Sequence, residues 1–208
     1  KTIGLKKIKY FIPGIDERSY YCIDKREELQ RVDETDVLYV GGGYVNSWGY
    51  KKALLMSQFT GFKFRLYGNK TWKRWIKIFP ELKNNYRESE YIPTAILNRM
   101  YNKTKLVPVD GNPGILNGFH MRLFETLGAG ALPLVEYRKD VDELLFNGSK
   151  AMVPLIRDYH RVKDIAAHFL KNEDERVEIV NGLKSYISER YNVKNATRIL
   201  LDNLKPFT

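Results

Sequence analysis

The sequence predicts an α/β domain of the doubly wound, Rossmann-like type, built on a parallel sheet. Three observations predict it. Short, almost continuously apolar runs, typical of strands buried on both faces, alternate along the chain with longer runs of helical pattern. Several of the apolar runs end in glycine or in polar turn residues. From residue 158 onward the pattern is helical only, which predicts extra C-terminal helices.

Five apolar runs predict the strands, at 36–40, 62–68, 105–109, 131–135 and 151–155. The first runs into a glycine turn at Gly41–Gly43, and the second is closed by Gly68. The third is followed by the loop sequence Asp-Gly-Asn-Pro-Gly. The polar stretch before Pro93 is expected to hold one more short strand near Tyr91.

The intervals between these runs predict helices at 48–59, 72–79, 94–101, 119–127, 141–146, 158–170, 174–191 and 193–204. Pro80 stops the second helix, and Pro93 opens the third at an early position that proline favours. Gly128 or Gly130 caps the helix at 119–127. Ligands of such sheets bind at the carboxyl ends of the strands. Those ends are Gly41–Gly43, Gly68–Lys70, Asp110–Asn117 and Glu136–Lys139.

The composition is that of a folded protein without a membrane-spanning helix. Apolar residues make up 43% of the 208 residues, and no apolar run approaches the length of a membrane span. Cys22 is the one cysteine, which excludes an intrachain disulfide and favours a reducing compartment. We therefore expect a cytoplasmic protein, with peripheral membrane contact as an option. The chain begins with neither Met nor a signal-peptide pattern, so we expect a piece of a longer protein.

The net charge of +10 is concentrated in one window. No acid occurs between Asp36 and Glu81. The window holds eight basic residues: Lys51, Lys52, Lys63, Arg65, Lys70, Lys73, Arg74 and Lys77. Such a region attracts phosphates, nucleic acid or anionic lipid, and the plain alternative is a solvated basic face. Trp72 and Trp75 lie among these lysines, so a non-catalytic binding module for nucleic acid or an anionic polymer is the alternative function.

The glycine turn at 41–43 is a candidate phosphate site. Glycines let backbone approach a phosphate closely, and the helix that follows offers its N-terminus. The stretch is not a Walker loop, since no Gly-Lys-Ser/Thr follows, and Asn46 stands where a dinucleotide fingerprint has its third glycine. A tight turn without a ligand is the alternative.

The stretch NGFHMRLFE at 117–125 places Arg122 and Glu125 three positions apart, on one side of a helix. An arginine there can fork onto a diphosphate, and a glutamate can accept both hydroxyls of a ribose. The alternative is a surface Arg–Glu pair, worth about 0.2–0.5 kcal/mol.

Residues 36–204 resemble the donor-binding, C-terminal half of GT-B glycosyltransferases, most closely the CgeB-like group with its "glycosyl transferases group 1" domain. The resemblance rests on four blocks in order: DVLYVGGGY, FRLYGNKTW, LNGFHMRLFETLGAGALPLV and DELLFNGSKAMV. It implies that Glu125 holds the ribose of a nucleotide and that Arg122 lies at its diphosphate. Gly118 faces the donor sugar and phosphates, and Gly41–Gly43 face the phosphates across the cleft.

The resemblance also implies positions for the rest of the donor. Tyr91 and Ile92 fall where backbone groups receive the base, and His120 and Asn117 lie on the sugar side. Retaining GT-B enzymes often carry a glutamate eight positions before the ribose glutamate. Asn117 stands there, which leaves retaining or inverting chemistry open, and no catalytic residue is assigned. Lys70 follows a strand-end glycine in the acid-free window, which makes it the lysine expected at the diphosphate.

Together these features predict a hexosyltransferase-like glycosyltransferase that binds a nucleotide-sugar, UDP-linked on family frequency, for transfer to an unknown acceptor. Neither a metal nor a cofactor beyond this co-substrate is expected, because cationic side chains can stabilise the leaving diphosphate and no Asp-x-Asp motif is present. Residues 1–35 resemble the connector after an acceptor domain, so 36–208 are expected to be the donor domain and the acceptor domain to be missing. An anionic membrane surface is a candidate partner, and nucleic acid is not expected.

Overall fold

The computed structural model describes residues 12, 14–24, 29–30, 32–111, 118–146 and 153–204. Six strands form one sheet in the order β3-β2-β1-β4-β5-β6, and every neighbouring pair is parallel. The strands are β1 (Thr35–Val40), β2 (Phe64–Gly68), β3 (Tyr86–Glu88), β4 (Thr104–Val109), β5 (Leu132–Glu136) and β6 (Leu155–Ile156). This is the strand order of a doubly wound, Rossmann-like sheet, so the predicted fold class is confirmed.

Strand β1 is the central strand and carries the sheet's change of direction. Val37 pairs with Phe64 of β2 on one side and with Leu106 of β4 on the other. The chain adds β2 and β3 outward from β1 in one direction, then returns to add β4, β5 and β6 in the other. A crevice opens at the carboxyl ends of the strands at such a switch point, here between β1 and β4.

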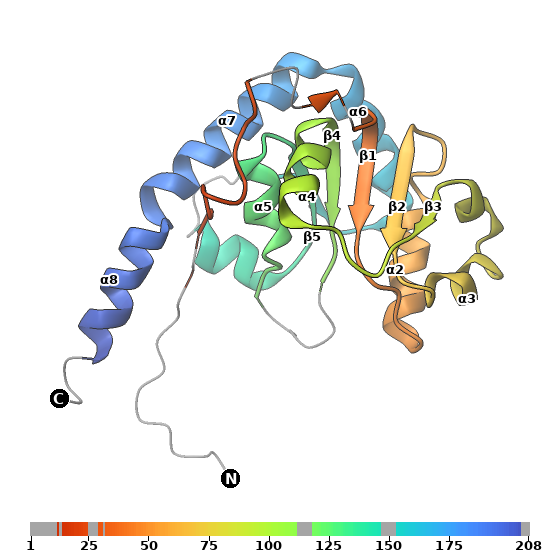
Figure 1. The fold of residues 1–208 in the computed structure, drawn as a ribbon, viewed down its shortest axis with the longest axis horizontal. Coiled ribbons are helices and arrows are strands. Elements are labelled where there is room, and N and C mark those ends of the chain that lie inside the picture. The colour runs from red at the N-terminus through yellow and green to blue at the C-terminus, as the bar shows by residue number, and fades with distance from the viewer. Residues whose placement is uncertain are drawn as a thin grey trace, which may run out of the picture.

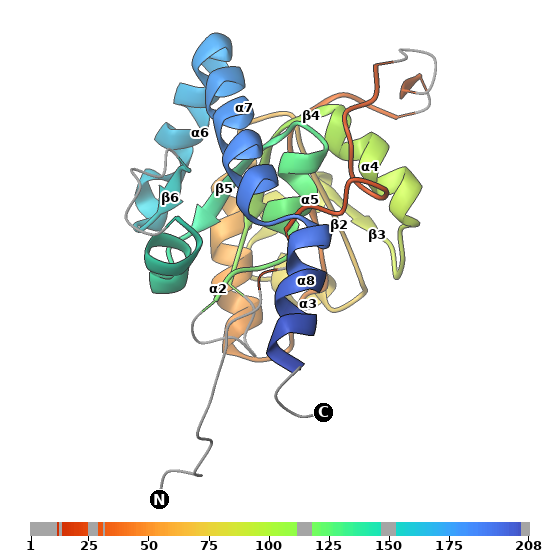
Figure 2. The ribbon, with the colours of Figure 1, turned by 90° about the vertical axis from the view of Figure 1, so that its left-hand side faces the viewer.

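Helices cover both faces of the sheet (Figures 1 and 2). They are α2 (Ser47–Ser57), α3 (Trp72–Ile76), α4 (Thr94–Asn102), α5 (Arg122–Gly128), α6 (Val162–Lys171), α7 (Glu173–Arg190) and α8 (Val193–Leu204). Alternate residues of β1 point to opposite faces. Val37 and Tyr39 belong to the larger core, whereas Leu38 packs with Met100 and Tyr101 of α4 in a second cluster. Burial on both faces explains why the strands read as continuous apolar runs.

Several predicted boundaries were displaced, and α3 ends at Ile76 rather than at Phe79. The short strand expected near Tyr91 lies earlier, at Tyr86–Glu88. Helix α5 begins at Arg122 rather than at Phe119, after a turn in which His120 Nδ1 accepts the Arg122 N–H (3.1 Å). The chain then leaves α5 through Gly130, whose φ of 87° is a left-handed value that glycine adopts at little cost.

The shorter elements and the C-terminal helices are close to their expected places. Three short helical turns, Pro80–Asn84, Val141–Leu145 and Tyr159–Arg161, complete the connections. Of the strand expected at 151–155, residues 151 and 152 lie outside the described part, and the observed strand β6 begins only at Leu155. The extra C-terminal helices are present as α6, α7 and α8, and α8 extends away from the sheet (Figure 1).

The described part of segment 14–24 packs against the same body. The Tyr21 N–H donates to Asn98 Oδ1 (3.2 Å), and the Ile23 N–H donates to Asn102 Oδ1 (2.7 Å), both on α4. Ile15 is buried and forms a bridge with Asn192, before α8. The role of residues 1–35 as a connector stays a prediction. Within the described residues, none of the helices is long and apolar enough to span a bilayer.

Candidate functional site

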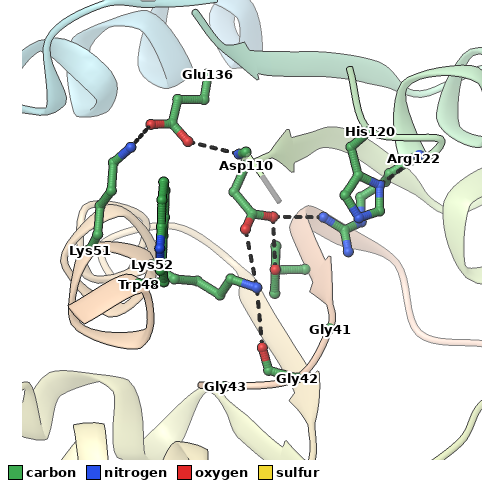
Figure 3. A network of polar contacts seen from close by, with 12 residues as sticks. Gly41, Gly42, Gly43, Trp48, Lys51, Lys52, Asp110, His120, Arg122 and Glu136 are labelled. Carbon is green, nitrogen blue, oxygen red and sulfur yellow. Dashed lines mark hydrogen bonds and ion pairs between the residues drawn. The ribbon is translucent and has the colours of Figure 1, made fainter. Parts of the chain in front are cut away.

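Asp110, the first residue after β4, is the centre of a buried polar network at the switch point (Figure 3). Its Oδ1 accepts from the Tyr39 hydroxyl (2.8 Å) and from Arg122 Nη1 (2.8 Å). Its Oδ2 lies 3.1 Å from Lys52 Nζ. These partners come from β1, α5 and α2, so one carboxylate joins three elements around the crevice.

The network carries an excess of positive charge. Asp110, Lys52 and Arg122 are all less than a tenth exposed, so one carboxylate faces two buried cations. Burial opposes ionisation of Asp110, but Arg122 and Lys52 outweigh it and hold the pKa of the carboxyl below its ordinary value. Removing the carboxylate would leave both cations without their buried counter-charge, which is a costly arrangement.

The same network fixes the backbone at the end of β1. Four successive carbonyls, at residues 40–43, each accept from a different side chain. The donors are Arg122 Nη2 to Val40 (2.7 Å), Trp72 Nε1 to Gly41 (2.8 Å), Lys52 Nζ to Gly42 (3.2 Å) and Thr71 Oγ1 to Gly43. A Cβ atom at Gly41 would lie 2.8 Å from the Tyr39 hydroxyl, so glycine is needed there for close approach.

Most amides of this glycine loop are already bonded within the protein. The Gly41 N–H donates to the Tyr67 carbonyl (2.9 Å), and the Gly43 N–H donates to Asn69 Oδ1 (3.2 Å). The Gly42 N–H has no hydrogen-bond partner among the described residues. Of the three glycines expected at a diphosphate, Gly42 is therefore the one with an open donor.

A second carboxylate, Glu136 at the end of β5, lies beside the first. It accepts from the Gly111 N–H (2.8 Å) and the Tyr159 hydroxyl (2.8 Å), and it pairs with Lys51 of α2. Burial raises the pKa of Glu136, but the bonds from Lys51 and Gly111 outweigh it and lower the pKa overall. The Lys51 side chain is 40% exposed and its Nζ lies 5.2 Å from the centre of the Trp48 ring, so it is the accessible cation of the site.

Arg122 is buried rather than open at the crevice surface. Its two Nη atoms bond Asp110 and the Val40 carbonyl, and its guanidinium lies 4.6 Å from the centre of the Tyr39 ring. The alternative of a surface pair with Glu125 is wrong, because the ion pair of Arg122 in the described structure is with Asp110. A direct bond from Arg122 to a diphosphate stays a prediction.

Glu125 has open acceptor capacity. Its side chain is partly buried and makes no hydrogen bond or ion pair with any described residue. Burial raises its pKa above the ordinary value, and nearby Arg122 opposes that rise. Burial and the Glu125 charge in turn raise the pKa of Tyr20 to about 12. A partly buried carboxylate with free lone pairs is suited to ribose hydroxyls, and that role stays a prediction.

The predicted sugar-side residues lie near both carboxylates. Gly118 and His120 line one small pocket together with Asp110 and Glu136. Burial and the neighbouring Arg122 lower the pKa of His120 to about 4, so its imidazole is neutral at neutral pH. Asn117, the third residue expected there, lies outside the described residues.

The predicted base-side residues also meet at one pocket. Tyr91 and Ile92 line a cavity of about 170 Å³ together with Gly41 and Gly42. Tyr91 itself is 77% exposed, which suits a contact through its backbone rather than a buried ring. Lys70 is not brought into the network. Its side chain is exposed, and it makes no contact with these residues in the described part of the chain.

Sequence reasoning located Asp110 and Glu136 at strand ends and Lys51 and Lys52 in the basic window, but it gave none of the four a role in the site. Two signals could have found them: each carboxylate directly follows or ends an apolar strand, and the adjacent lysines lie one turn into the first helix. Among the described residues, no group of three or more His, Cys, Asp or Glu side chains is placed to hold a metal ion.

The tryptophans of the basic window are core residues. Trp72 is fully buried and Trp75 is 5% exposed, and both indole N–H groups bond backbone carbonyls of the loop after β1. Neither ring can therefore stack on a nucleic-acid base. The two tryptophans therefore no longer support the alternative function of a nucleic-acid binding module.

Comparisons with known proteins agree with this geometry. The model of the family described as "Glycosyl transferase-like" matches residues 51–202. No curated protein sequence matched significantly. Among solved structures, the chain is similar to a sucrose-phosphate synthase from Thermosynechococcus elongatus, with a TM-score of 0.69 and 14% identity over 93% of this chain and 51% of that one.

Two further solved structures share the fold. HepE of Anabaena, in complex with UDP and glucose, has a TM-score of 0.71 at 12% identity over 95% of this chain and 57% of its own. The C-terminal domain of a glycosyl transferase group 1 family protein, LpcC of Francisella tularensis, has a TM-score of 0.59 at 9% identity over 86% of this chain and 100% of its own. The chain thus spans about half the length of the synthase and of HepE.

Proposed function

Because the chain belongs to the glycosyl transferase-like family, we propose that it is the donor-binding half of a nucleotide-sugar glycosyltransferase. One observation carries the proposal. At the switch point between β1 and β4, two carboxylates are surrounded by four cations: Lys51, Lys52, Arg122 and Arg138. The cations outnumber the carboxylates at the edge where such sheets bind nucleotides, which favours an anionic ligand.

In this proposal the nucleotide lies across the carboxyl ends of β1, β2 and β4. The base enters the cavity at Tyr91 and Ile92, and Glu125 accepts the ribose hydroxyls. The diphosphate lies at the open Gly42 N–H and at Lys51. The sugar points toward Gly118, His120 and Asn117. A UDP-linked donor is supported by HepE, whose structure holds UDP and glucose, and the CgeB-like assignment remains our interpretation of the sequence blocks.

The chemistry that these residues supply is stabilisation of the leaving diphosphate. Negative charge grows on the diphosphate oxygens as the bond to the sugar breaks, and fixed cations in a partly buried site stabilise it without rearranging. Lys51 is exposed enough to touch the ligand, whereas Lys52 and Arg122 act through their field and by fixing the loop. We expect no metal to be required. The acceptor, the stereochemistry and the part of the enzyme that binds the acceptor are left open.

Isothermal titration calorimetry with UDP, GDP, ADP and uridine tests the proposal. We expect a nucleoside diphosphate to bind, uridine to bind more weakly, and the preference to persist at moderate salt. A single-stranded oligonucleotide is the counter-test, since polymer binding falls steeply as salt rises. Tighter binding of the oligonucleotide than of every nucleoside diphosphate would overturn the proposal.

A further inference from the structure

The basic window divides between two places in the fold. Lys51 and Lys52 point into the crevice, where Glu136 and Asp110 pair with them (Figure 3). The crevice does not use Lys73, Arg74 and Lys77, which lie on the outer surface of α3 and the turn after it. Binding of a nucleotide-sugar in the crevice therefore does not account for the positive charge at these three residues.

These three cations share an exposed surface with two apolar side chains. Ile78, 54% exposed, follows Lys77, and Tyr50 of α2, 45% exposed, packs beside them with its ring centre 5.4 Å from that of Phe79. We call Tyr50, Lys73, Arg74, Lys77 and Ile78 the α3 patch. Lys73 pairs with Glu88 (2.5 Å), whereas Arg74 and Lys77 have no ion pair with a described residue.

We propose that the α3 patch binds the surface of an anionic lipid bilayer. Clustered lysine and arginine side chains are attracted to anionic headgroups, and each cation near such a surface strengthens binding about fivefold. Exposed aliphatic and tyrosine side chains next to them can enter the headgroup boundary while the charged ends remain in water. Residues 70–79 contain four cations and no acid, and the exposed Ile78 belongs to the same stretch.

The patch fits a bilayer better than it fits a nucleic acid. Ile78 offers nothing to a phosphate backbone, and the two tryptophans that could stack on bases are buried beneath the patch. Figure 1 places α3 and the start of α2 at the carboxyl edge of the sheet, which is the edge that carries the Asp110 network. A bilayer on the patch would hold that crevice close to the membrane surface, which suits an acceptor carried by a lipid.

Co-sedimentation of the whole chain with vesicles tests this. The vesicles are phosphatidylcholine alone or phosphatidylcholine mixed with phosphatidylserine. We expect binding to the mixed vesicles only. The double variant Arg74→Gln/Lys77→Gln should bind them about twenty-five-fold more weakly. The matched control Lys163→Gln/Lys171→Gln removes two exposed charges from α6 and should change binding little. Ile78→Ser should weaken vesicle binding severalfold at unchanged charge.

The outcomes separate the rival explanations. Equal losses in the two double variants would show that net charge alone attracts the vesicles, and would overturn the proposal. So would an absence of vesicle binding by the unaltered chain. Binding of a single-stranded oligonucleotide that falls with Arg74→Gln/Lys77→Gln but not with Ile78→Ser, without vesicle binding, would make the patch a nucleic-acid surface. UDP affinity should be the same in all variants, so failure here is distinct from failure of the proposed donor site.

Discussion

Arg122 and Asp110 form a buried ion pair that joins the start of α5 to the end of β4. Nη1 and Oδ1 are 2.8 Å apart, and the side chains are 7% and 6% exposed. The second Nη of Arg122 bonds the last carbonyl of β1. The ends of β1 and β4 and the start of α5 are thereby held in one arrangement, at the edge of the sheet proposed to bind the diphosphate.

Replacing Asp110 by Asn should destabilise the fold strongly. The substitution keeps the volume but removes the only negative charge bonded to Lys52 and Arg122 within the described network. We expect the free energy of unfolding to fall by about 3–5 kcal/mol, the usual loss when one partner of a buried pair is removed. Urea denaturation measures it. Asp142→Asn, at an exposed carboxylate paired with Arg157, is the control and should cost less than about 1 kcal/mol. Similar losses in both variants would mean that Asp110 has no special role.

Glu125→Gln should weaken ligand binding without weakening the fold. Glu125 is partly buried and unpaired in the described structure, so losing its charge should leave the free energy of unfolding unchanged or raise it. Affinity for UDP and for uridine should both fall by about 1.5–3 kcal/mol, because both ligands carry the ribose. Calorimetry with 2′-deoxy-UDP supplies the contrast, since the loss should shrink when one hydroxyl is missing. Unchanged affinities with a lowered melting temperature would make Glu125 a structural residue.

Lys51→Gln should weaken binding of the diphosphate but not of the nucleoside. Lys51 is the accessible cation of the crevice, so we expect UDP affinity to fall by about 1.5–3 kcal/mol while uridine affinity is unaffected. Lys139→Gln, an exposed lysine of the loop after β5 that pairs with Glu143, is the matched control and should change neither affinity. Titrations of both ligands against both variants decide the matter, and parallel losses for UDP and uridine would place Lys51 away from the phosphates.

The free energy of unfolding should decrease as pH falls from about 6.5 to about 4. Burial and Arg122 lower the pKa of His120 from 6.5 to about 4. Above pH 6.5 the imidazole is neutral in both the folded and the unfolded state, so His120 causes no loss in the free energy of unfolding there. Between the two pKa values the unfolded state binds a proton that the folded state does not, so the free energy of unfolding falls, by about 3 kcal/mol in total.

A variant isolates the contribution of this residue. His120→Asn should flatten the decrease, because an asparagine oxygen can still accept the Arg122 N–H two residues on. His160→Asn, which replaces an exposed histidine, should leave the slope as it was. Urea denaturation across the pH range is the measurement, and an unaltered slope in His120→Asn would show that other groups cause the decrease.

Sequence patterns revealed the fold because both faces of the sheet are buried. The strands containing Val37, Leu106 and Leu132 read as apolar runs, and their order follows from the doubly wound type. The residues of the site could be predicted only in part from the sequence. Arg122 and Glu125 were found on the signature stretch, but the true partner of Arg122, Asp110, belongs to another element, and helical spacing says nothing of contacts between elements. The start of α5 was misplaced for a similar reason, since the turn that His120 closes on the Arg122 N–H forms only in the folded chain.

The four side-chain hydrogen bonds to the carbonyls of residues 40–43 restrict which changes in loop length this protein can accept. Each donor in that row comes from a different residue of α2, α3, α5 or the turn before α3, and each is matched to one carbonyl. Inserting or deleting a single residue between Val40 and Gly43 would shift these carbonyls out of register with the side chains that donate to them. Buried groups such as the Trp72 indole would then be left without an acceptor. Relatives that keep this row of donors should therefore vary the side chains around the crevice freely but conserve the length of the loop to the residue.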